Sequence, residues 1–432
     1  MARMDDRITS HGNGGEEYSS EDPCIPVLNS IRGKIDGLPP LSNDCCIFRV
    51  PKRLRDINEK AFTPQSVSIG PFHRGKEHLE AMEKDKVRYM QSFLNRTSTS
   101  LESFIRKVKD WEGSVRSCYT ESINLSSKDF VEMILLDSCF IVEVIYRSYS
   151  SSSKQTDYLD RKVFTNKLIQ DMILIENQLP FFVLEDLFNL SSIIPKQKTT
   201  SFIMLSIRYL KRFYVISHIE ESFLRNAGVK NFVNLLRLCH LPSSPRSLPC
   251  NYVPVPTATQ LQEAGMKFKK GSSNCMLDIT RGSMELLEIP HLTIWSGTES
   301  LLLNLVALEE YQYLFDSYII DYIYFMDRLI DSAKDVDLLV QNKIFENRLG
   351  DSSAVASLFN KLALQVSLCD RNYYYSDLSD SLNDYCNNWW HRSKAVLKRD
   401  YFCSPWRCVS TLAALTLLGL TLTQTICSIL SL

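Results

Sequence analysis

The run MILIENQLPFFVL, residues 172–184, places three adjacent polar side chains inside a strongly apolar segment. Pro180 has no N–H to donate to the carbonyl of Glu176, so a helix through this run must kink or restart. If the segment is buried, Glu176, Asn177 and Gln178 need polar partners, and a freed backbone carbonyl is an obvious one for Gln178. We interpret the run as a structural break between helices, with a ligand site as the alternative.

Helical periodicity extends outward from this run in both directions. Apolar residues recur at helical spacing in residues 77–94, 130–145, 159–190, 204–216, 318–339 and 354–368. Residues 241–256 contain prolines at positions 242, 245, 249, 254 and 256, which excludes a helix interior there. The pattern predicts a mainly α fold, a multi-helix globular body whose two parts meet at this Pro-rich linker.

A small β section is predicted directly after the linker. Short apolar segments at residues 266–269, 275–279 and 286–294 are separated by turns that contain glycine and serine. Just before them, Thr259 and Gln262 have the spacing of a capping box, in which the threonine hydroxyl accepts from a free backbone N–H and the glutamine reaches back. We therefore expect a helix to begin at this threonine and to lead into the strands.

Length and charge limit the organisation and the partners. The chain has 432 residues, and its 49 Lys and Arg nearly balance its 50 Asp and Glu. A balanced charge provides no global field for gripping nucleic acid, so we expect no nucleic-acid partner. We divide the chain into a disordered N-terminal tail (1–44), an N-terminal helical part (45–240), the Pro-rich linker (241–256), a C-terminal helical part with the β section (257–400) and a transmembrane helix (407–430).

The C-terminal segment is long and apolar enough to cross a bilayer. From Cys408 onward no side chain carries a formal charge, and a helix of about 20 residues spans the hydrocarbon core. We assign to this membrane anchor Cys408, Leu412, Leu415, Gly419, Gln424 and Ile426. A buried core helix is the alternative. The small residues Gly419, Thr423 and Cys427 share one helical face and could pack two anchors into a homodimer.

Flanking charges predict how this segment is oriented. Five basic residues precede it: Arg392, Lys394, Lys398, Arg399 and Arg407. The positive-inside rule then places the body of the protein in the cytosol, and the same cluster could hold anionic lipid headgroups. We therefore expect a single-pass membrane protein, at the plasma membrane, that contacts membrane lipid.

Cysteine usage and glycosylation sequons bear on the same topology. The 13 cysteines include no C-x-x-C pair, which is typical of a reducing compartment. Sequons occur at Asn95, Asn124 and Asn189, and such triplets often arise by chance. A body that faces outward is the alternative topology, and glycans on these three asparagines would be its sign.

The sequence contains no recognised catalytic or cofactor motif. Glycine-rich phosphate loops, the G-x-S-x-G elbow and the H-E-x-x-H zinc motif are all absent. We therefore expect no enzyme activity, no cofactor and no metal. An unrecognised enzyme is the alternative, with His73, Asp137 and Glu176 as a buried acid/base group if the fold brings them together.

Asp137 is a charged residue inside the apolar run LLDSCF, residues 135–140. A buried carboxylate requires a cation or a cluster of donors. Arg49, Arg74 or Arg88 could supply the cation, and the sequence does not choose among them.

Eight short segments are spread over residues 45–432. They are IFRVP (47–51), PQSVSIGPFH (64–73), residues 79–90 with Lys86 and Arg88, LDSCF (136–140), ENQLPF (176–181), EAGMKF (263–268), NLVA (304–307) and YFCSPW (401–406). Their combination resembles the plant DUF247 family, also called UPF0481. The residues that we assign to the family motifs are Arg49, Pro51, Gly70, Pro71, His73, Asp137, Glu176, Asn177, Gln178, Pro180, Gly265, Asn304, Pro405 and Trp406.

The resemblance implies a mainly helical plant protein with one C-terminal span, and no enzymatic activity is established for the family. Some grass members are associated with the male determinant of self-incompatibility, and extending that recognition role to this chain is an analogy at the level of the fold. Our leading hypothesis is a non-enzymatic, membrane-anchored protein that recognises an unidentified protein partner. A recognition ligand at the cell surface is a further alternative.

Overall fold

The computed structural model describes residues 24–36, 45–150, 165–193, 200–217, 219–242, 244, 251–283, 285–364, 366, 372–388 and 405–430. The chain divides into two compact units, residues 1–43 and residues 44–432. In the smaller unit, helix α1 (Cys24–Asp36) lies inside the segment expected to be a disordered tail. Its apolar side chains at Val27, Ile31 and Ile35 are at least half exposed.

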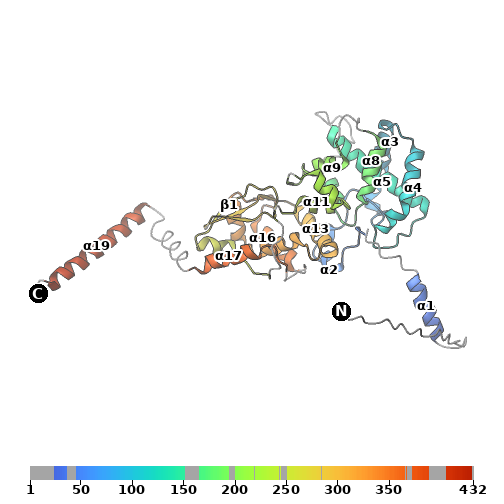
Figure 1. The fold of residues 1–432 in the computed structure, drawn as a ribbon. Helices are drawn as coiled ribbons and strands as arrows, with labels where there is room; N and C mark the ends of the chain where they lie inside the picture. Colours follow the sequence, from blue (N-terminus) through green and yellow to red (C-terminus); the bar gives the residue numbers. More distant parts are fainter. Residues whose placement is uncertain are drawn as a thin grey trace, which may run out of the picture. The chain divides into compact units, whose positions relative to one another are not determined.

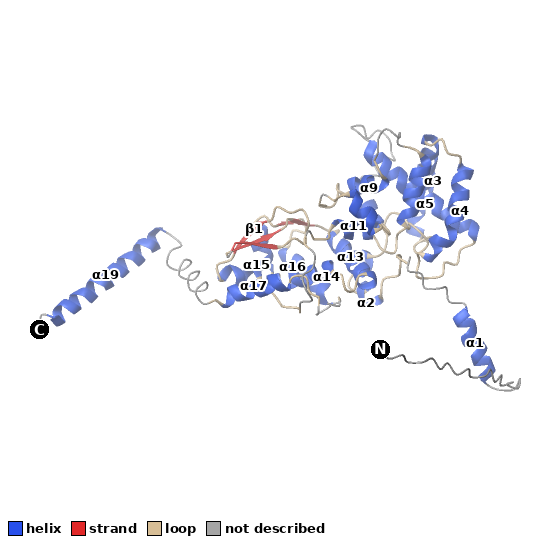
Figure 2. Cartoon of the chain, viewed as in Figure 1, coloured by secondary structure: helices blue, strands red, loops and turns tan. Residues whose placement is uncertain are grey.

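The larger unit is built mainly from helices (Figure 1, Figure 2). Its N-terminal part contains α2 (Lys52–Arg55), η1 (Glu59–Ala61), η2 (Glu77–Leu79), α3 (Glu80–Arg96), α4 (Leu101–Ser117), α5 (Ser127–Ser150), α7 (Asn166–Met172), α8 (Phe181–Ser191), α9 (Phe202–Leu210), α10 (Glu221–Ala227) and α11 (Phe232–Cys239). Its C-terminal part contains α12 (Ala258–Glu263), α13 (Thr298–Gln312), α14 (Tyr318–Leu329), α15 (Ala333–Gln341), α16 (Ser352–Leu364), α17 (Ser376–Asn387) and α19 (Pro405–Leu430). The mainly α fold class is therefore confirmed.

Helix α5 is the centre of the N-terminal part. It is apolar around most of its circumference, and nearly every side chain from Phe130 to Ile145 is buried. A helix that is apolar on all sides must be covered on all sides. Helices α3, α4, α8 and α9 pack against it and provide this cover. Edge-to-face contact between Tyr89 of α3 and Phe140 of α5, with ring centroids 5.0 Å apart, is one of the contacts that join them.

The C-terminal part is a second helical cluster with short strands. Helix α13 packs against α11, η1 and α14, and so joins the two parts of the larger unit. Helix α16 packs against α14 and α15, and α12 packs against α15 and α17. The Pro-rich residues 241–256 contain no helix in the positions that the structure describes. Because both parts belong to one compact unit, this segment connects them within a single body.

The strands form two small sheets. Strands β1 (Lys267–Lys270), β2 (Thr280–Ser283) and β3 (Leu286–Ile289) form a sheet in the order β1-β3-β2, parallel between β1 and β3 and antiparallel between β3 and β2. Strands β4 (Leu292–Ile294) and β5 (Phe345–Asn347) pair in parallel. The predicted strand over 286–294 is thus split between two sheets at Pro290, which lacks the N–H that a continuous ladder needs.

Two local predictions were wrong in detail. Residues 275–279 form a turn instead of a strand, with the Asp278 N–H donating to the Cys275 carbonyl. The capping box is formed by Thr257 and Gln260, two residues earlier than expected, and α12 begins directly after Thr257. Both pairs have the required spacing. The earlier one is used because the Thr259 N–H donates instead to Asp335 Oδ1 of α15, at 2.8 Å.

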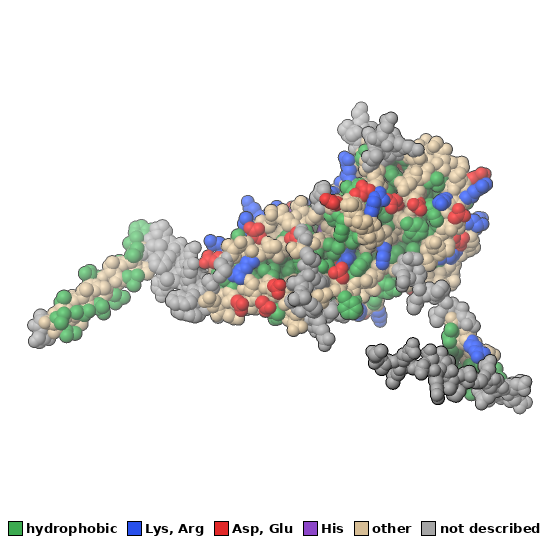
Figure 3. Space-filling view, in the orientation of Figure 1, with side chains coloured by type: hydrophobic (Ala, Val, Ile, Leu, Met, Phe, Trp, Pro, Cys, Tyr) green, Lys and Arg blue, Asp and Glu red, His purple; other side chains and the backbone are tan. Residues whose placement is uncertain are grey.

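Helix α19 contains the one candidate membrane span in the described part of the chain, Val409–Leu430, with a mean hydropathy of 1.7. None of that segment is buried, and Figure 3 shows hydrophobic side chains along it. Of the flanking basic residues, Arg392, Lys394, Lys398 and Arg399 lie outside the described residues, as does the side chain of Arg407. By length and composition, the predicted C-terminal helix is present.

Candidate functional site

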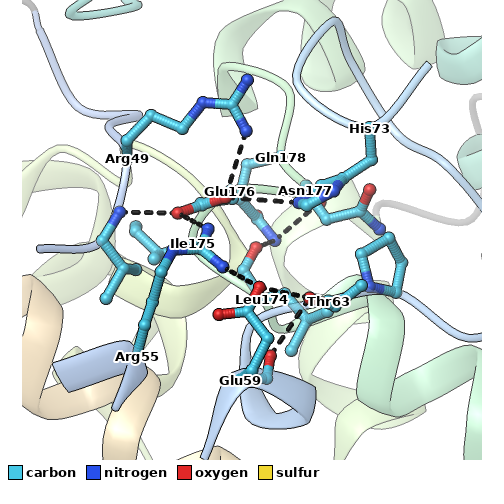
Figure 4. Close-up of polar contacts among 12 residues, drawn as sticks. Arg49, Arg55, Glu59, Thr63, His73, Leu174, Ile175, Glu176, Asn177 and Gln178 are labelled. Atoms are coloured by element: carbon cyan, nitrogen blue, oxygen red, sulfur yellow. Dashed lines mark hydrogen bonds and ion pairs between the residues drawn. The ribbon is translucent and has the colours of Figure 1, made fainter. Parts of the chain in front are cut away.

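The segment between α7 and α8 carries the polar triplet, and it is buried. Helix α7 ends at Met172 and α8 restarts at Phe181, directly after Pro180, whose φ of −59° suits a helix start. The chain therefore breaks where the sequence predicts. Figure 4 shows Glu176, Asn177 and Gln178 pointing into a dense set of polar contacts. All three side chains are at most 1% exposed, so each must find its partners within the protein.

Gln178 satisfies the backbone that the helix break leaves unpaired. Its Nε2 donates to the carbonyls of Met172 at 2.7 Å and Leu174 at 2.8 Å. Its Oε1 accepts from the Phe232 N–H at the start of α11, at 3.0 Å. The expectation that this amide would bond to the carbonyl of Glu176 was wrong, because its Nε2 donates instead to the carbonyls of Met172, Leu174 and Asn177. The same side chain also ties α11 to the break.

Asn177 and Asp171 together clamp the loop at residues 65–70. Asn177 Oδ1 accepts from the Ile69 N–H at 2.7 Å, and its Nδ2 donates to the Val67 carbonyl at 3.0 Å. Asp171 accepts from the N–H groups of three consecutive residues, 65, 66 and 67. Burial raises the pKa of Asp171 to about 6, although these donors act in the opposite direction. Two side chains therefore hold this loop through its backbone.

Glu176 is the centre of an ion-pair cluster. Its Oε1 accepts from the Val50 N–H at 2.6 Å and pairs with Arg55, and its Oε2 lies 3.4 Å from Arg49 Nη1. Burial raises the pKa of Glu176, but His73, the Val50 N–H and Arg55 together outweigh burial and hold it below its ordinary value. The carboxylate is therefore ionised at neutral pH, with its charge balanced inside the protein.

His73 lies beside this carboxylate in its neutral form. Its Nε2 is 3.4 Å from Glu176 Oε2, without the geometry of a hydrogen bond, and the ring is 1% exposed. Burial lowers the pKa of His73, although the neighbouring carboxylate acts against the shift. Arg49 lies 4.3 Å from the centroid of the Phe72 ring, next to this histidine. Only Arg49 among these charged groups has an exposed side chain, at 41%.

Asp137 forms a separate ion pair, and its cation is Lys86 of α3. The ammonium lies 2.6 Å from Asp137 Oδ1 and 2.6 Å from Glu83 Oε1, and it also donates to the Ser68 carbonyl. Burial raises the pKa of Asp137, and Lys86 opposes that rise. The expectation of an arginine partner was therefore wrong. Because α3 packs directly against α5, Lys86 of α3 lies beside the carboxylate of Asp137.

Gly70 links the two ion-pair centres. Its N–H donates to Asp137 Oδ2 at 2.8 Å, and its φ is +71°. A Cβ at this position would lie 2.7 Å from the Gln178 carbonyl oxygen and 2.9 Å from the Tyr119 hydroxyl. That hydroxyl donates to the same carbonyl at 3.0 Å. Only glycine fits both the backbone conformation and the space.

Asn304 of α13 attaches the C-terminal part to the same centre. Its Oδ1 accepts from the Ile175 N–H at 2.8 Å, and its Nδ2 donates to the carbonyls of Ala61 and Ser300. Pro51 precedes α2 and its carbonyl accepts from the Leu54 N–H. The contacts of Asn304 connect η1, α13 and the break between α7 and α8.

Most of the remaining predicted residues lie away from this polar centre. Gly265 follows α12 with φ +98°, and the Met266 N–H donates to the Leu261 carbonyl, which closes that helix. Pro71 is half-buried next to Gly70. Pro405 is the first residue of α19, and Trp406 is 82% exposed. Of the residues assigned to the anchor, Leu412, Leu415, Gly419, Gln424 and Ile426 are exposed, and the side chain of Cys408 lies outside the described residues.

Three features that the sequence reasoning missed complete the buried polar structure. Arg55 reaches Glu176, Asp171 clamps residues 65–67, and Arg237 of α11 pairs with Glu309 of α13 at 2.8 Å. Burial raises the pKa of Glu309 to about 7, while Arg237 lowers it. Like Asp137, Arg237 and Glu309 are charged residues inside apolar helical runs, and that signal could have found them.

His73, Asp137 and Glu176 do not come together as one acid/base group; the two carboxylates belong to separate buried ion pairs. Glu176 and His73 are in contact, but Asp137 contacts Lys86 and Gly70 and neither of the other two in the described residues. Nor does any of the three line the three cavities whose walls include Trp295, Ser357 and Tyr324 respectively. No group of three or more metal-ligating side chains occurs within the described part of the chain.

The fold and its polar centre define a class: mainly helical proteins whose interior is joined by buried ion pairs and which carry an apolar C-terminal helix. The family model of DUF247, described as plant protein of unknown function, matches residues 47–420. The chain belongs to the DUF247 family. The resemblance noted from its motifs is thereby confirmed.

Two relatives from Arabidopsis thaliana match over most of their length. The UPF0481 protein At3g47200 is 29% identical over 417 residues, covering 90% of this chain and 87% of the relative. The putative UPF0481 protein At3g02645 is 23% identical over 472 residues, covering 87% and 88%. No solved structure matches the chain.

Proposed function

We propose that this protein is a non-enzymatic, membrane-anchored recognition protein, held by α19 with its helical body in the cytosol, at the plasma membrane. The observation that carries the proposal is α19 itself. Its candidate span covers 22 residues and none of it is buried. An apolar helix of that length needs an apolar solvent, and a lipid bilayer is the one that suits it.

The polar groups of α19 suit a lipid environment as well. The hydroxyls of Thr416, Thr421, Thr423 and Thr425 each donate to a carbonyl three or four residues earlier in the helix. Hydroxyls that are satisfied in this way do not require water. Leu412, Leu415 and Leu418 are all more than half exposed, which would be unfavourable in water.

The non-enzymatic part of the proposal is supported by how the body uses its buried charges. Glu176 and Asp137 bind backbone N–H groups and cations from other segments. Their carboxylate oxygens therefore stabilise the fold. For partner recognition, the body presents Leu314 and Phe315 in the turn after α13, 47% and 76% exposed. Exposed large apolar side chains of this kind occur at protein-protein contacts.

Membrane fractionation of the full-length chain tests the anchor. We expect the protein to remain in the membrane pellet after extraction at alkaline pH. The paired substitutions Leu415→Arg and Leu418→Arg should release it, since each arginine near the bilayer centre opposes insertion by about 3 kcal/mol. Leu415→Ala with Leu418→Ala is the matched control and should stay in the pellet. Wild-type protein in the supernatant would refute the anchor.

Protease protection on intact vesicles tests the orientation. With a cytosolic body, an N-terminal epitope should be lost when protease is added to sealed vesicles. Protection of that epitope would favour the second candidate, a recognition ligand outside the cell. The specific observation in favour of that candidate is that Asn95, Asn124 and Asn189 are all exposed. Glycans on them would give an endoglycosidase mobility shift, and the cytosolic topology predicts none.

Site-specific photo-crosslinking in plant membranes tests recognition. A photoreactive residue at Phe315 should give a discrete protein adduct. The same residue at the exposed Lys109 of α4 should not give that adduct. Identical adducts from both positions would show that the turn after α13 has no specific partner.

A further inference from the structure

A cavity of about 460 Å³ lies apart from the polar centre, between the two helical parts. Its walls come from the turn after α9 (residues 211–215), the end of α11, residues 274–276, strand β4 with Trp295, and the first turn of α13. Ligand pockets commonly have volumes of about 300–1,000 Å³, so the cavity is large enough for a small organic molecule.

The wall of this cavity is basic. Lys211, Arg212, His291 and Arg348 line it, and no aspartate or glutamate is among the described residues of its wall. Glu346 is the acidic residue that pairs with this wall: its Oε1 lies 2.9 Å from Arg348 Nε and its Oε2 lies 3.8 Å from His291 Nε2. Lys211 forms no ion pair within the part of the chain that the structure describes. The cavity therefore favours an anion.

The interior of the same cavity is aromatic and apolar. Tyr214 and Trp295 lie side by side, with ring centroids 6.5 Å apart. Leu301 and Leu302, from the first turns of α13, add aliphatic wall. Flat apolar bodies pack well against such surfaces. The combination of a basic wall and an aromatic interior therefore suits a molecule with both an anionic group and a flat apolar part.

Two buried polar groups in the wall lack partners. His240 is 4% exposed and neither of its ring nitrogens has a hydrogen bond among the described residues; the Tyr214 hydroxyl, in a residue 6% exposed, also has none there. Buried polar groups are nearly always paired, so an unpaired one requires an explanation. Burial lowers the pKa of His240 to about 4, so at neutral pH the ring presents one donor and one acceptor.

We propose that this cavity is a binding site for a small organic anion with a flat aromatic body. Its anionic group pairs with Lys211 and Arg348, and its ring packs against Trp295 and Tyr214. Membrane attachment is tested by fractionation, so this proposal and the proposed function can fail separately.

Ligand-induced thermal stabilisation of the full-length chain in neutral detergent tests the site. The two probes are naphthalene-1-carboxylate and its uncharged analogue naphthalene-1-carboxamide, which have nearly the same shape. We expect the carboxylate to raise the unfolding temperature saturably, because a ligand that binds only the folded state stabilises it. The carboxamide should need about tenfold higher concentration for the same shift. No saturable shift with the carboxylate, or equal shifts with both probes, would overturn the proposal.

Reversing the charge of two basic wall residues tests whether the probe binds in this cavity. The double variant Lys211→Glu/Arg348→Glu should weaken carboxylate binding about tenfold or more and leave carboxamide binding unchanged. Lys109→Glu, an exposed lysine on α4, is the matched control and should bind as the wild type does. If the double variant does not fold, Lys211→Gln replaces it, since that exposed side chain has no ion pair to lose in the described structure. Unchanged carboxylate affinity in these variants would show that the cavity is not the site.

Discussion

Glu176→Gln tests whether the ion-pair cluster holds the body together. The substitution keeps the shape of the side chain, and the amide oxygen can still accept from the Val50 N–H. It removes the charge that faces Arg55, Arg49 and His73, and replaces one acceptor oxygen with a donor. Breaking a buried ion pair from one side costs about 3–5 kcal/mol. Here Arg55, only 19% exposed, is left with Glu59 as its remaining carboxylate partner.

The expected shift in unfolding temperature follows from the size of the body. At the usual entropy per residue, a unit the size of residues 44–432 unfolds with an entropy of about 0.8 kcal/mol/K. A loss of about 3–5 kcal/mol therefore lowers the unfolding temperature by about 4–6 °C, measured by calorimetry or by intrinsic fluorescence. Glu121→Gln is the matched control, because Glu121 also pairs with Arg49, at 3.5 Å, but is half exposed. We expect its effect to be below about 1 kcal/mol.

The pH dependence gives a second readout of the same substitution. The pKa of Glu176 is lower in the folded protein than its ordinary value. Its contribution to stability is therefore complete above the ordinary glutamate pKa of about 4.3 and is lost as the pH falls through the lower folded value. The difference between wild type and Glu176→Gln should disappear in that acidic range. An effect no larger than that of Glu121→Gln, or one independent of pH down to that range, would refute the reasoning.

Three further substitutions test other parts of the structure. Gly70→Ala should lower the free energy of unfolding, measured with denaturant, by about 2–4 kcal/mol, because the added Cβ is strained at positive φ and clashes with the Gln178 carbonyl. Gly75→Ala is the control: at φ +80° with no atom near the added Cβ, it should cost about 1 kcal/mol in the same assay. Asn304→Leu should cost about 1–3 kcal/mol in the same assay, because it leaves the buried Ile175 N–H without its acceptor, while the Ala61 carbonyl still accepts from the Ser300 hydroxyl; a loss below about 1 kcal/mol would contradict the assigned contacts. His240→Gln should reduce the loss of stability between pH 6.5 and about 4, where the ring stays neutral in the folded protein but takes up a proton in the unfolded chain. Unchanged acid sensitivity would show that this ring does not take up a proton on unfolding.

Much of the local structure was predictable from the sequence. The break at Pro180 and the restart of the helix at Phe181 follow from the missing proline N–H, a property of one residue. The apolar stripe of residues 130–145 predicted a helix, and α5 covers it. The apolar composition of residues 408–432 predicted a C-terminal helix, and α19 is that helix. These features depend on residues close together in the chain.

The partners of the buried charges were not predictable in the same way. The sequence showed that Asp137 needs a cation. That this cation is Lys86 depends on the packing of α3 against α5, which the sequence does not show. Likewise, two threonines near residue 258 could cap α12, and a distant aspartate, Asp335, decided between them. Strand prediction failed over residues 275–279 because a four-residue turn, closed by the Asp278 N–H and the Cys275 carbonyl, forms there instead of a ladder. Each of these outcomes depends on contacts between distant segments.

The sequence by itself determined where helices form and break, which segment is apolar enough to enter a membrane, and the family to which the chain is similar. Periodicity, proline chemistry and motif residues are properties of neighbouring positions, so no folding is needed to read them. Tertiary structure alone decided which charges meet at Glu176 and Asp137, why Gly70 has no room for a Cβ, and that basic and aromatic residues from distant segments line one cavity. Contacts of that kind join residues up to hundreds of positions apart, and hydrophobic patterning fixes which face of a helix is buried without fixing what it meets.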